Sequence, residues 1–116
     1  MQERHRDRKI YFDEQSKTTA EYVIPYVSQS MTINSDIRVL EVGCGEGGNL
    51  MPFVELGCEV VGIDLNGPQI ERAREYIEEN KPEAKATLIF DDIYNIAPEE
   101  LGAFCLLYTS PSPRDS

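Results

Sequence analysis

Apolar and polar positions change along the chain in blocks, and these blocks predict strands that alternate with helices. Three short apolar runs with β-branched residues predict strands at residues 37–42, 58–63 and 86–90. Between them, apolar residues recur at helical spacing in segments 47–56 and 66–80. Strands and helices that alternate in this way imply a parallel sheet with right-handed crossovers, so the expected fold class is α/β.

The segment before the first predicted strand favours a helix from Asp13 or Ser16 to Met31. Its apolar residues recur at steps of three and four and should form one buried face, made of Ala20, Val23, Ile24, Val27 and Met31. Pro25 interrupts this helix, so we expect a kink or a break there. Residues 1–9 are almost wholly polar and are expected to form a solvated, partly frayed terminus.

A glycine-rich turn follows the first predicted strand. Apolar residues there are followed by glycines at positions 43, 45, 47 and 48, and a helical pattern begins at Asn49. Glycines let the backbone approach a ligand closely, and the start of a helix offers free N–H groups. The second predicted strand leads into Asp64, whose carboxylate can accept hydrogen bonds from the two hydroxyls of a ribose. Together these features predict a nucleoside-binding unit.

Two classes of cofactor fit this turn. Gly43, Gly45 and Gly48 satisfy the glycine pattern of dinucleotide-binding folds, which favours an NAD-dependent oxidoreductase. Glu41 favours another class, because dinucleotide-binding strands usually carry a small or apolar residue at that place. A carboxylate at the tip of the strand suits a cationic ligand, such as an ammonium group or a sulfonium.

Three motifs follow one another in an order and spacing that is known from one enzyme family. An acid followed by three alternating glycines is matched by Glu41, Gly43, Gly45 and Gly47. Acids that end the next two strands are matched by Asp64 and by the segment 91–93. The sequence therefore resembles the class I S-adenosylmethionine-dependent methyltransferases. The resemblance implies a Rossmann-like parallel sheet, S-adenosyl-L-methionine as cofactor, and methyl transfer to an unidentified small-molecule acceptor. A non-catalytic nucleoside-binding fragment is the alternative from another functional class.

The resemblance implies roles at the methionyl end of the cofactor. Gly43 and Gly45 would let the backbone pass close to it, and Gly47 would do the same where the helix begins. Glu41 would contact the ammonium group, directly or through water. The alternative for Glu41 is an acid that caps nearby backbone N–H groups. The motifs imply no catalytic base, so the catalytic residues remain unknown at this stage.

The resemblance also implies roles at the adenosine end. Asp64 would accept the two ribose hydroxyls, or else serve only to cap the next helix. Leu65 would lie against the adenine ring. Asp92 would accept a hydrogen bond from the exocyclic amine, and the backbone N–H of Ile93 would reach a ring nitrogen. The adjacent Asp91 is the rival of Asp92 for this role, because only one of the two acids can point inward.

The chain divides into three parts by the same resemblance. Residues 1–104 look like the N-terminal part of a methyltransferase domain, with a helical segment at 1–36 and a cofactor-binding βαβαβ unit at 37–104. Residues 105–116 resemble translated sequencing-adapter read-through and are expected to be a non-native or disordered tail, whose first residues can mimic a short strand. We therefore expect an incomplete sheet of about three to four strands with flanking helices, in the order third, second, first, fourth.

Composition narrows the expected partners and location. The 116 residues are 41% hydrophobic and 28% charged, and no apolar run approaches a membrane span, so a cytoplasmic protein with no membrane partner is expected. The net charge of −10 argues against a nucleic-acid partner. The three cysteines lack metal-binding spacing, so we expect no metal. Cys44 is expected to be only a small residue in the glycine-rich turn.

Overall fold

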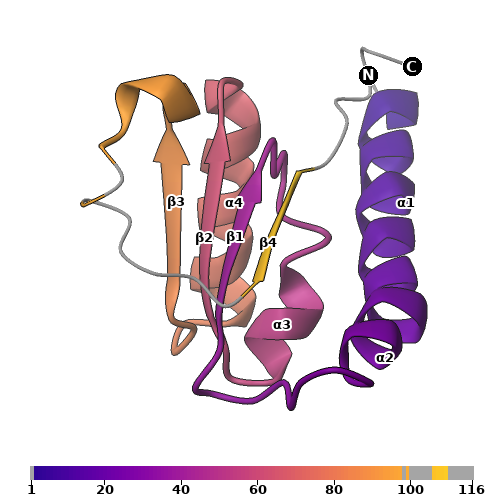
Figure 1. The fold of residues 1–116 in the computed structure, drawn as a ribbon. Helices are drawn as coiled ribbons and strands as arrows, with labels where there is room; N and C mark the ends of the chain where they lie inside the picture. The colour runs from indigo at the N-terminus through magenta and orange to yellow at the C-terminus, as the bar shows by residue number, and fades with distance from the viewer. Residues whose placement is uncertain (1, 98, 100–105, 110–116) are drawn as a thin grey trace.

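A four-stranded parallel sheet lies at the centre of the chain, which the computed structural model describes at residues 2–97, 99 and 106–109 (Figure 1). The strand order is β3-β2-β1-β4, and each neighbouring pair is parallel. The strands are β1 (Arg38–Val42), β2 (Glu59–Asp64), β3 (Ala86–Phe90) and β4 (Leu106–Thr109). The predicted fold class, strand direction and strand order are therefore confirmed.

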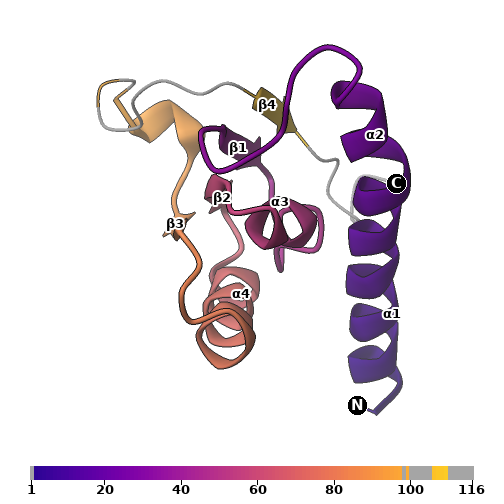
Figure 2. The ribbon, with the colours of Figure 1, turned by 90° about the horizontal axis from the view of Figure 1, so that it is seen from below.

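Two helices connect the first three strands and lie on the same face of the sheet (Figure 2). They are α3 (Met51–Glu55) and α4 (Gly67–Asn80). Helix α4 starts where the sequence predicts, because the Asn66 side chain accepts a hydrogen bond from the Gln69 N–H at 3.1 Å. Helix α3 starts later than predicted, because Gly47 has a φ of 89°, which no α-helix can include.

The larger part of the core fills the space between the sheet and these two helices. Its fully buried side chains include Val39, Val60, Phe53 and Ile70. Gly62 of β2 faces the same space, and a Cβ built on it would lie 2.7 Å from the Sγ of Cys44. The glycine therefore allows the turn after β1 to pack directly onto β2.

A smaller apolar cluster covers the other face of the sheet. Leu40, Val61 and Ile63 are buried there, and the partly buried Ile89 and Ile93 pack against them. Adjacent residues of β1 and β2 thus bury their side chains on opposite faces of the sheet. Apolar side chains therefore cover β2 on both faces of the sheet, as is usual for a parallel strand.

The N-terminal helix is longer than the sequence pattern predicts. Helix α1 (Gln2–Thr18) begins at Gln2 rather than at Asp13 or Ser16, so the expected frayed terminus is wrong for the backbone of residues 2–9. The segment is rich in glutamine, glutamate, arginine and lysine, which form helices well without an apolar stripe. An ion pair one helical turn apart, from Lys9 Nζ to Asp13 Oδ2 at 3.0 Å, supports it further.

A π-helical turn, η1 (Thr19–Val23), separates α1 from α2 (Ile24–Val27). The Ile24 N–H donates to the Thr19 carbonyl five residues earlier. Pro25 has no N–H to donate, so the interruption expected at Pro25 takes the form of this wide turn. Residues seven apart share a face in an unbroken α-helix, yet Thr19 is 2% exposed and Tyr26 is 74% exposed. The π turn therefore rotates the second half of the helix relative to the first.

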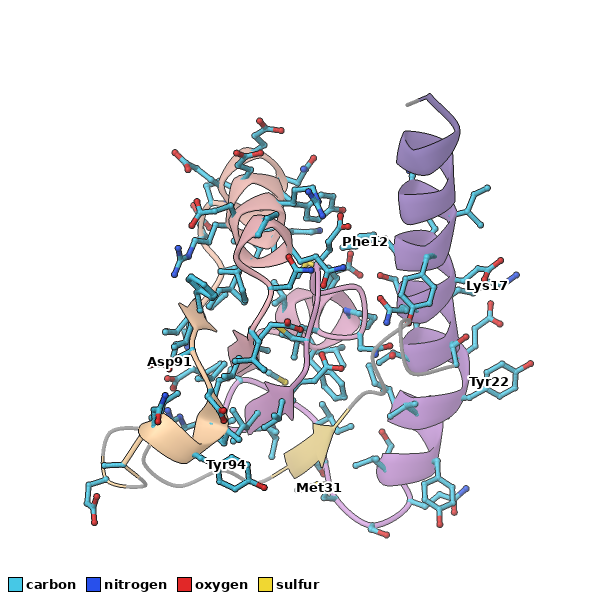
Figure 3. All side chains as sticks on the ribbon, turned by 90° about the horizontal axis from the view of Figure 1, so that it is seen from above. Phe12, Lys17, Tyr22, Met31, Asp91 and Tyr94 are labelled. Carbon is cyan, nitrogen blue, oxygen red and sulfur yellow. The ribbon has the colours of Figure 1, made fainter. Side chains whose placement is uncertain are left out.

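The rotation decides which apolar residues reach the core. Val23, Ile24 and Met31 pack against it, as the sequence predicts. Ala20, which was expected on the same buried face, is exposed. In Figure 3, Phe12 points from α1 toward the sheet and its helices, while Lys17 and Tyr22 point away. The Phe12 and Tyr76 rings meet with centroids 4.8 Å apart, which joins α1 to α4.

The C-terminal segment contributes one described strand to the sheet. Strand β4 pairs with β1 from Val39 to Val42. The remaining residues of the expected tail at 105–116 lie outside the described residues, and so does nearly all of the helical turn that the pattern around residues 98–101 suggests. Among the residues that the structure describes, no helix is both long and apolar enough to cross a membrane.

Candidate functional site

The glycine-rich turn lies at the carboxyl end of β1 and is held against β2. The N–H groups of Gly43 and Cys44 donate to the carbonyl of Ile63 at 2.7 and 3.2 Å. Gly43, Gly45 and Gly47 have φ values of 81°, 57° and 89°, in the left-handed region that residues with a Cβ rarely adopt. The turn therefore requires glycine for its backbone conformation.

Packing adds a second reason for two of these glycines. A Cβ on Gly45 would lie 3.3 Å from Oε1 of Gln69 in α4, and one on Gly47 would lie 3.3 Å from Cε of Met51 in α3. Both contacts are tighter than usual for a Cβ. The turn is therefore fitted closely between β1 and the helices behind it.

Asp64 connects the glycine-rich turn to the start of α4. Its Oδ2 accepts the Gly45 N–H at 2.8 Å, and its Oδ1 accepts the Asn66 N–H at 2.8 Å. Each carboxylate oxygen can accept two hydrogen bonds, so both can take a further donor. The half-buried Asp64 carboxylate can therefore hold the turn in place and still bind a ligand's hydroxyl groups.

Glu41 lies in β1, just before the turn, and is fully buried. Its Oε2 accepts a hydrogen bond from Nδ2 of Asn49 at 3.1 Å. The Oδ1 of Asn49 in turn accepts from the hydroxyl of Thr19 at 3.0 Å. Sequence reasoning missed both of these residues. Asn49 could have been noticed as a polar side chain beside the glycines, whereas nothing in the sequence connects Thr19 to a site thirty residues away.

Cys44 lies within the turn and is 2% exposed. Burial raises the pKa of its thiol, and the nearby carboxylates of Glu41 and Asp64 raise it further. The thiol therefore keeps its proton at neutral pH and is a poor nucleophile. This agrees with the expectation that Cys44 serves as a small residue in a tight loop.

The third predicted segment follows β3 at the same edge of the sheet. The Asp91 N–H donates to the Asp64 carbonyl at 3.1 Å, which places the two acidic segments side by side. Asp91 Oδ1 accepts from the Asp92 N–H at 2.7 Å, and Asp92 Oδ1 accepts from the Tyr94 N–H at 3.0 Å. The Asp92 carboxylate thus caps the short 3-10 turn η2 (Ile93–Asn95), which carries Tyr94 in Figure 3, and the Asp91 carboxylate accepts the backbone N–H just before this turn.

Exposed apolar side chains lie beside these acids. Leu65 is 67% exposed after β2, Phe90 is 60% exposed at the end of β3, and Tyr94 is 93% exposed. Side chains of this kind can pack against a flat ring. The predicted site residues therefore lie at the carboxyl edge of the sheet, where open α/β sheets bind their ligands. Glu41 and Asp64 lie near the ends of β1 and β2, and the others lie in the segments that follow β1, β2 and β3.

Comparison with known proteins agrees with this geometry. A family model described as a methyltransferase domain matches residues 39–111. The sterol 24-C-methyltransferase of Clavispora lusitaniae is 34% identical over 83 residues, which cover 67% of this chain and 22% of that protein. The chain spans about a fifth of the length of the sterol methyltransferases that it matches.

Solved structures share the fold. The glycopeptide N-methyltransferase MtfA, in complex with sinefungin, superimposes with a TM-score of 0.61 at 21% identity, over 78% of this chain and 35% of that chain. The magnesium protoporphyrin IX methyltransferase ChlM from Synechocystis, with bound SAH, gives a TM-score of 0.64 at 19% identity, over 81% of this chain and 41% of that chain.

Proposed function

The chain belongs to the methyltransferase domain family, and on that premise we propose that it binds S-adenosylmethionine and serves methyl transfer to a small-molecule acceptor. One observation carries the proposal. The hydrogen bond from Gly45 N–H to Asp64 Oδ2, at 2.8 Å, joins the first two motifs of the family at one edge of the sheet. The buried acid Glu41 and the exposed Leu65 lie at the two ends of this arrangement.

At the methionyl end, we propose that Glu41 attracts the ammonium group of the cofactor. The carboxylate is fully buried, where an ionic attraction is stronger than in water. Gly43, Gly45 and Gly47 give the turn after β1 its left-handed backbone conformation, and its main-chain N–H groups would meet the carboxylate of the ligand. These residues match a ligand whose end carries both an ammonium and a carboxylate.

At the adenosine end, Asp64 accepts the ribose hydroxyls while it keeps its two backbone partners. Leu65 covers one face of the adenine ring, because its side chain is largely exposed. Asp92 accepts a hydrogen bond from the exocyclic amine of adenine, and the Ile93 N–H donates to a ring nitrogen. Asp91 is the alternative acid for the bond to the amine. The short distance between the Asp64 and Asp91 main chains supports this grouping.

For methyl transfer, the protein mainly has to position the cofactor and the acceptor. The cofactor supplies a methyl group that is already activated by the positive charge of its sulfonium. The chain's own residues bind and orient the cofactor, so that the methyl group faces an acceptor in line with the departing sulfur. No side chain of the described site is assigned as a base.

A small-molecule acceptor is proposed on two grounds. The net charge of −10 disfavours a polyanionic nucleic acid, and the named sterol relatives have a small molecule in their names. A second candidate function is nucleoside binding without transfer. The observation that favours it is that the chain spans only about a fifth of those relatives, and methyl transfer to any acceptor would exclude it.

Calorimetric titration with S-adenosylhomocysteine, with NAD as the comparison ligand, tests the cofactor assignment. We expect S-adenosylhomocysteine to bind and NAD not to bind. Asp64→Asn should weaken binding at least about tenfold, because a hydrogen bond to a charged group is lost. Asp36→Asn is the matched control, since Asp36 is an exposed acid in the loop before β1, and it should bind as the unaltered chain does. Preferential binding of NAD, or equal binding by Asp64→Asn, would contradict the proposal.

A further inference from the structure

We infer that Thr19 and Asn49 form a positioning relay that orients the Glu41 carboxylate toward the cationic end of the ligand; the inference rests on the proposed function. The relay consists of two hydrogen bonds in series. The Thr19 hydroxyl donates to Asn49 Oδ1 at 3.0 Å, and Asn49 Nδ2 donates to Glu41 Oε2 at 3.1 Å. It links the N-terminal helical segment to the acid of the first motif.

The Glu41 carboxylate determines which way the Asn49 amide faces. An amide oxygen can only accept and an amide nitrogen can only donate. If the amide were turned over, its oxygen would face the Glu41 carboxylate and repel it. A hydroxyl can donate or accept, so the Thr19 hydroxyl donates to Oδ1 in this orientation and holds the amide in place. Thr19 therefore acts on Glu41 through Asn49, although it does not touch the carboxylate itself.

Close packing holds Thr19 in register with Asn49. One turn before it, the Ser16 hydroxyl donates to the Gly48 carbonyl at 2.7 Å. A Cβ on Gly48 would lie 2.9 Å from the Phe12 carbonyl, so the backbone of α1 rests directly on the turn. Thr19 is also the first residue of the π-helical turn, a feature that is frequent at functional sites. These contacts leave the Thr19 side chain 2% exposed.

The relay affects ligand binding because the Glu41 carboxylate is buried. A fully buried carboxylate is costly unless hydrogen bonds hold it, and here one oxygen is bonded to Asn49. With Oε2 held in this way, the orientation of the carboxylate plane is set before the ligand arrives. An ammonium group then meets an acceptor that needs no reorientation.

The test uses two ligands and a conservative series at position 19. S-Adenosylhomocysteine carries the ammonium group, whereas 5′-methylthioadenosine has the same nucleoside and sulfur without the amino-acid end. Thr19→Val keeps the shape and removes the hydroxyl, and Thr19→Ser restores it. Thr18→Val is the matched control, because Thr18 is exposed on the same helix and makes no side-chain cap.

We expect Thr19→Val to weaken the binding of S-adenosylhomocysteine about fivefold, the weight of one hydrogen bond between neutral groups, and to change the binding of 5′-methylthioadenosine by less than about twofold. Thr19→Ser and Thr18→Val should bind both ligands as the unaltered chain does. Thermal melts monitor folding, and if Thr19→Val is unfolded, Asn49→Ala must show the same selectivity between ligands.

The outcomes separate this inference from the proposed function. Equal loss of both ligands in Thr19→Val would show a merely structural role and overturn the relay. So would unchanged binding of S-adenosylhomocysteine. If the unaltered chain binds neither ligand, the proposed function itself fails. Selective loss for S-adenosylhomocysteine, restored by serine, supports the relay.

Discussion

At the scale of single residues, two carboxylates set the electrostatics of the glycine-rich turn. Glu41 is fully buried and Asp64 is half-buried, and both raise the pKa of the Cys44 thiol that lies within the turn, although burial is the larger cause. A concentration of negative charge beside a turn built from glycines favours a cation over a second anion. This local balance is a physical reason to expect a sulfonium and an ammonium here.

The raised pKa of Cys44 predicts how stability changes with pH. The folded chain keeps the thiol proton above the ordinary pKa of 9.0, where the unfolded chain loses it. The contribution to stability is therefore complete below pH 9 and is lost as pH rises, with a slope of up to about 1.4 kcal/mol per pH unit. Urea unfolding from neutral to alkaline pH should show the free-energy difference between the unaltered chain and Cys44→Ala shrinking above pH 9. A difference that stays constant across that range would contradict this linkage.

At the scale of whole elements, α1 is part of the site because of where it rests. It contacts the turn through Ser16 and Gly48, and it contacts α4 through Phe12 and Tyr76. Neither contact involves the sheet. Helix α1 therefore depends on the glycine-rich turn for its position, and the turn depends on η1, which continues α1, for the Thr19 hydroxyl.

Gly48→Ala should loosen α1 without disturbing the sheet. The added Cβ would lie 2.9 Å from the Phe12 carbonyl and from the Gln15 Cβ, and backbone atoms cannot move aside easily. We expect a loss of about 1–3 kcal/mol in the free energy of unfolding, as for an overpacked contact. Hydrogen exchange should accelerate in α1 while β1 and β2 stay protected.

Gly67→Ala provides the control for this change. A Cβ there would meet the Phe90 ring at 3.4 Å, an ordinary contact, and Gly67 is the first residue of α4. Its exchange pattern and stability should remain close to those of the unaltered chain. Equal exchange in α1 for both variants would show that the helix is not held by the Gly48 contact.

At the scale of the whole molecule, net charge should discriminate between the two forms of the cofactor. The chain carries −10, S-adenosylmethionine carries one net positive charge, and S-adenosylhomocysteine carries none. A negative molecular field attracts the first and not the second, and salt screens that attraction. Raising the ionic strength from about 20 to 300 mM should therefore weaken the binding of S-adenosylmethionine about two- to threefold more than the binding of S-adenosylhomocysteine. Calorimetry at both salt concentrations measures this.

The double variant Glu78→Lys with Glu79→Lys is a suitable comparison for the salt dependence of ligand binding. Both acids are exposed near the end of α4, away from the glycine-rich turn, so they alter the field and not the contacts. The difference in salt dependence between the two ligands should become smaller in this variant. The same salt dependence for both ligands in the unaltered chain would mean that the field plays no part in selecting the charged form.

The features that were predictable from the sequence are those that depend on near neighbours. Alternating apolar runs predicted a parallel sheet and the bounds of β3, whereas the observed strand order was predicted by the family resemblance. Asn66 predicted the start of α4 because a helix cap involves residues three apart. The glycines and Asp64 were recognisable because the turn they form needs particular residue types at short spacing.

Other features were decided only when distant segments met. The length of α1 had no apolar periodicity to reveal it, since its residues form a helix through their propensity and through the ion pair of Lys9 and Asp13. Gly62 is required because Cys44 packs over it, and the Thr19 hydroxyl at the start of the π turn meets a site formed thirty residues later. Periodicity reports which side of an element is buried, but not which atom it meets there. The sequence by itself therefore determined the sheet and the motif residues, whereas the tertiary structure decided the hydrogen bonds that orient Glu41.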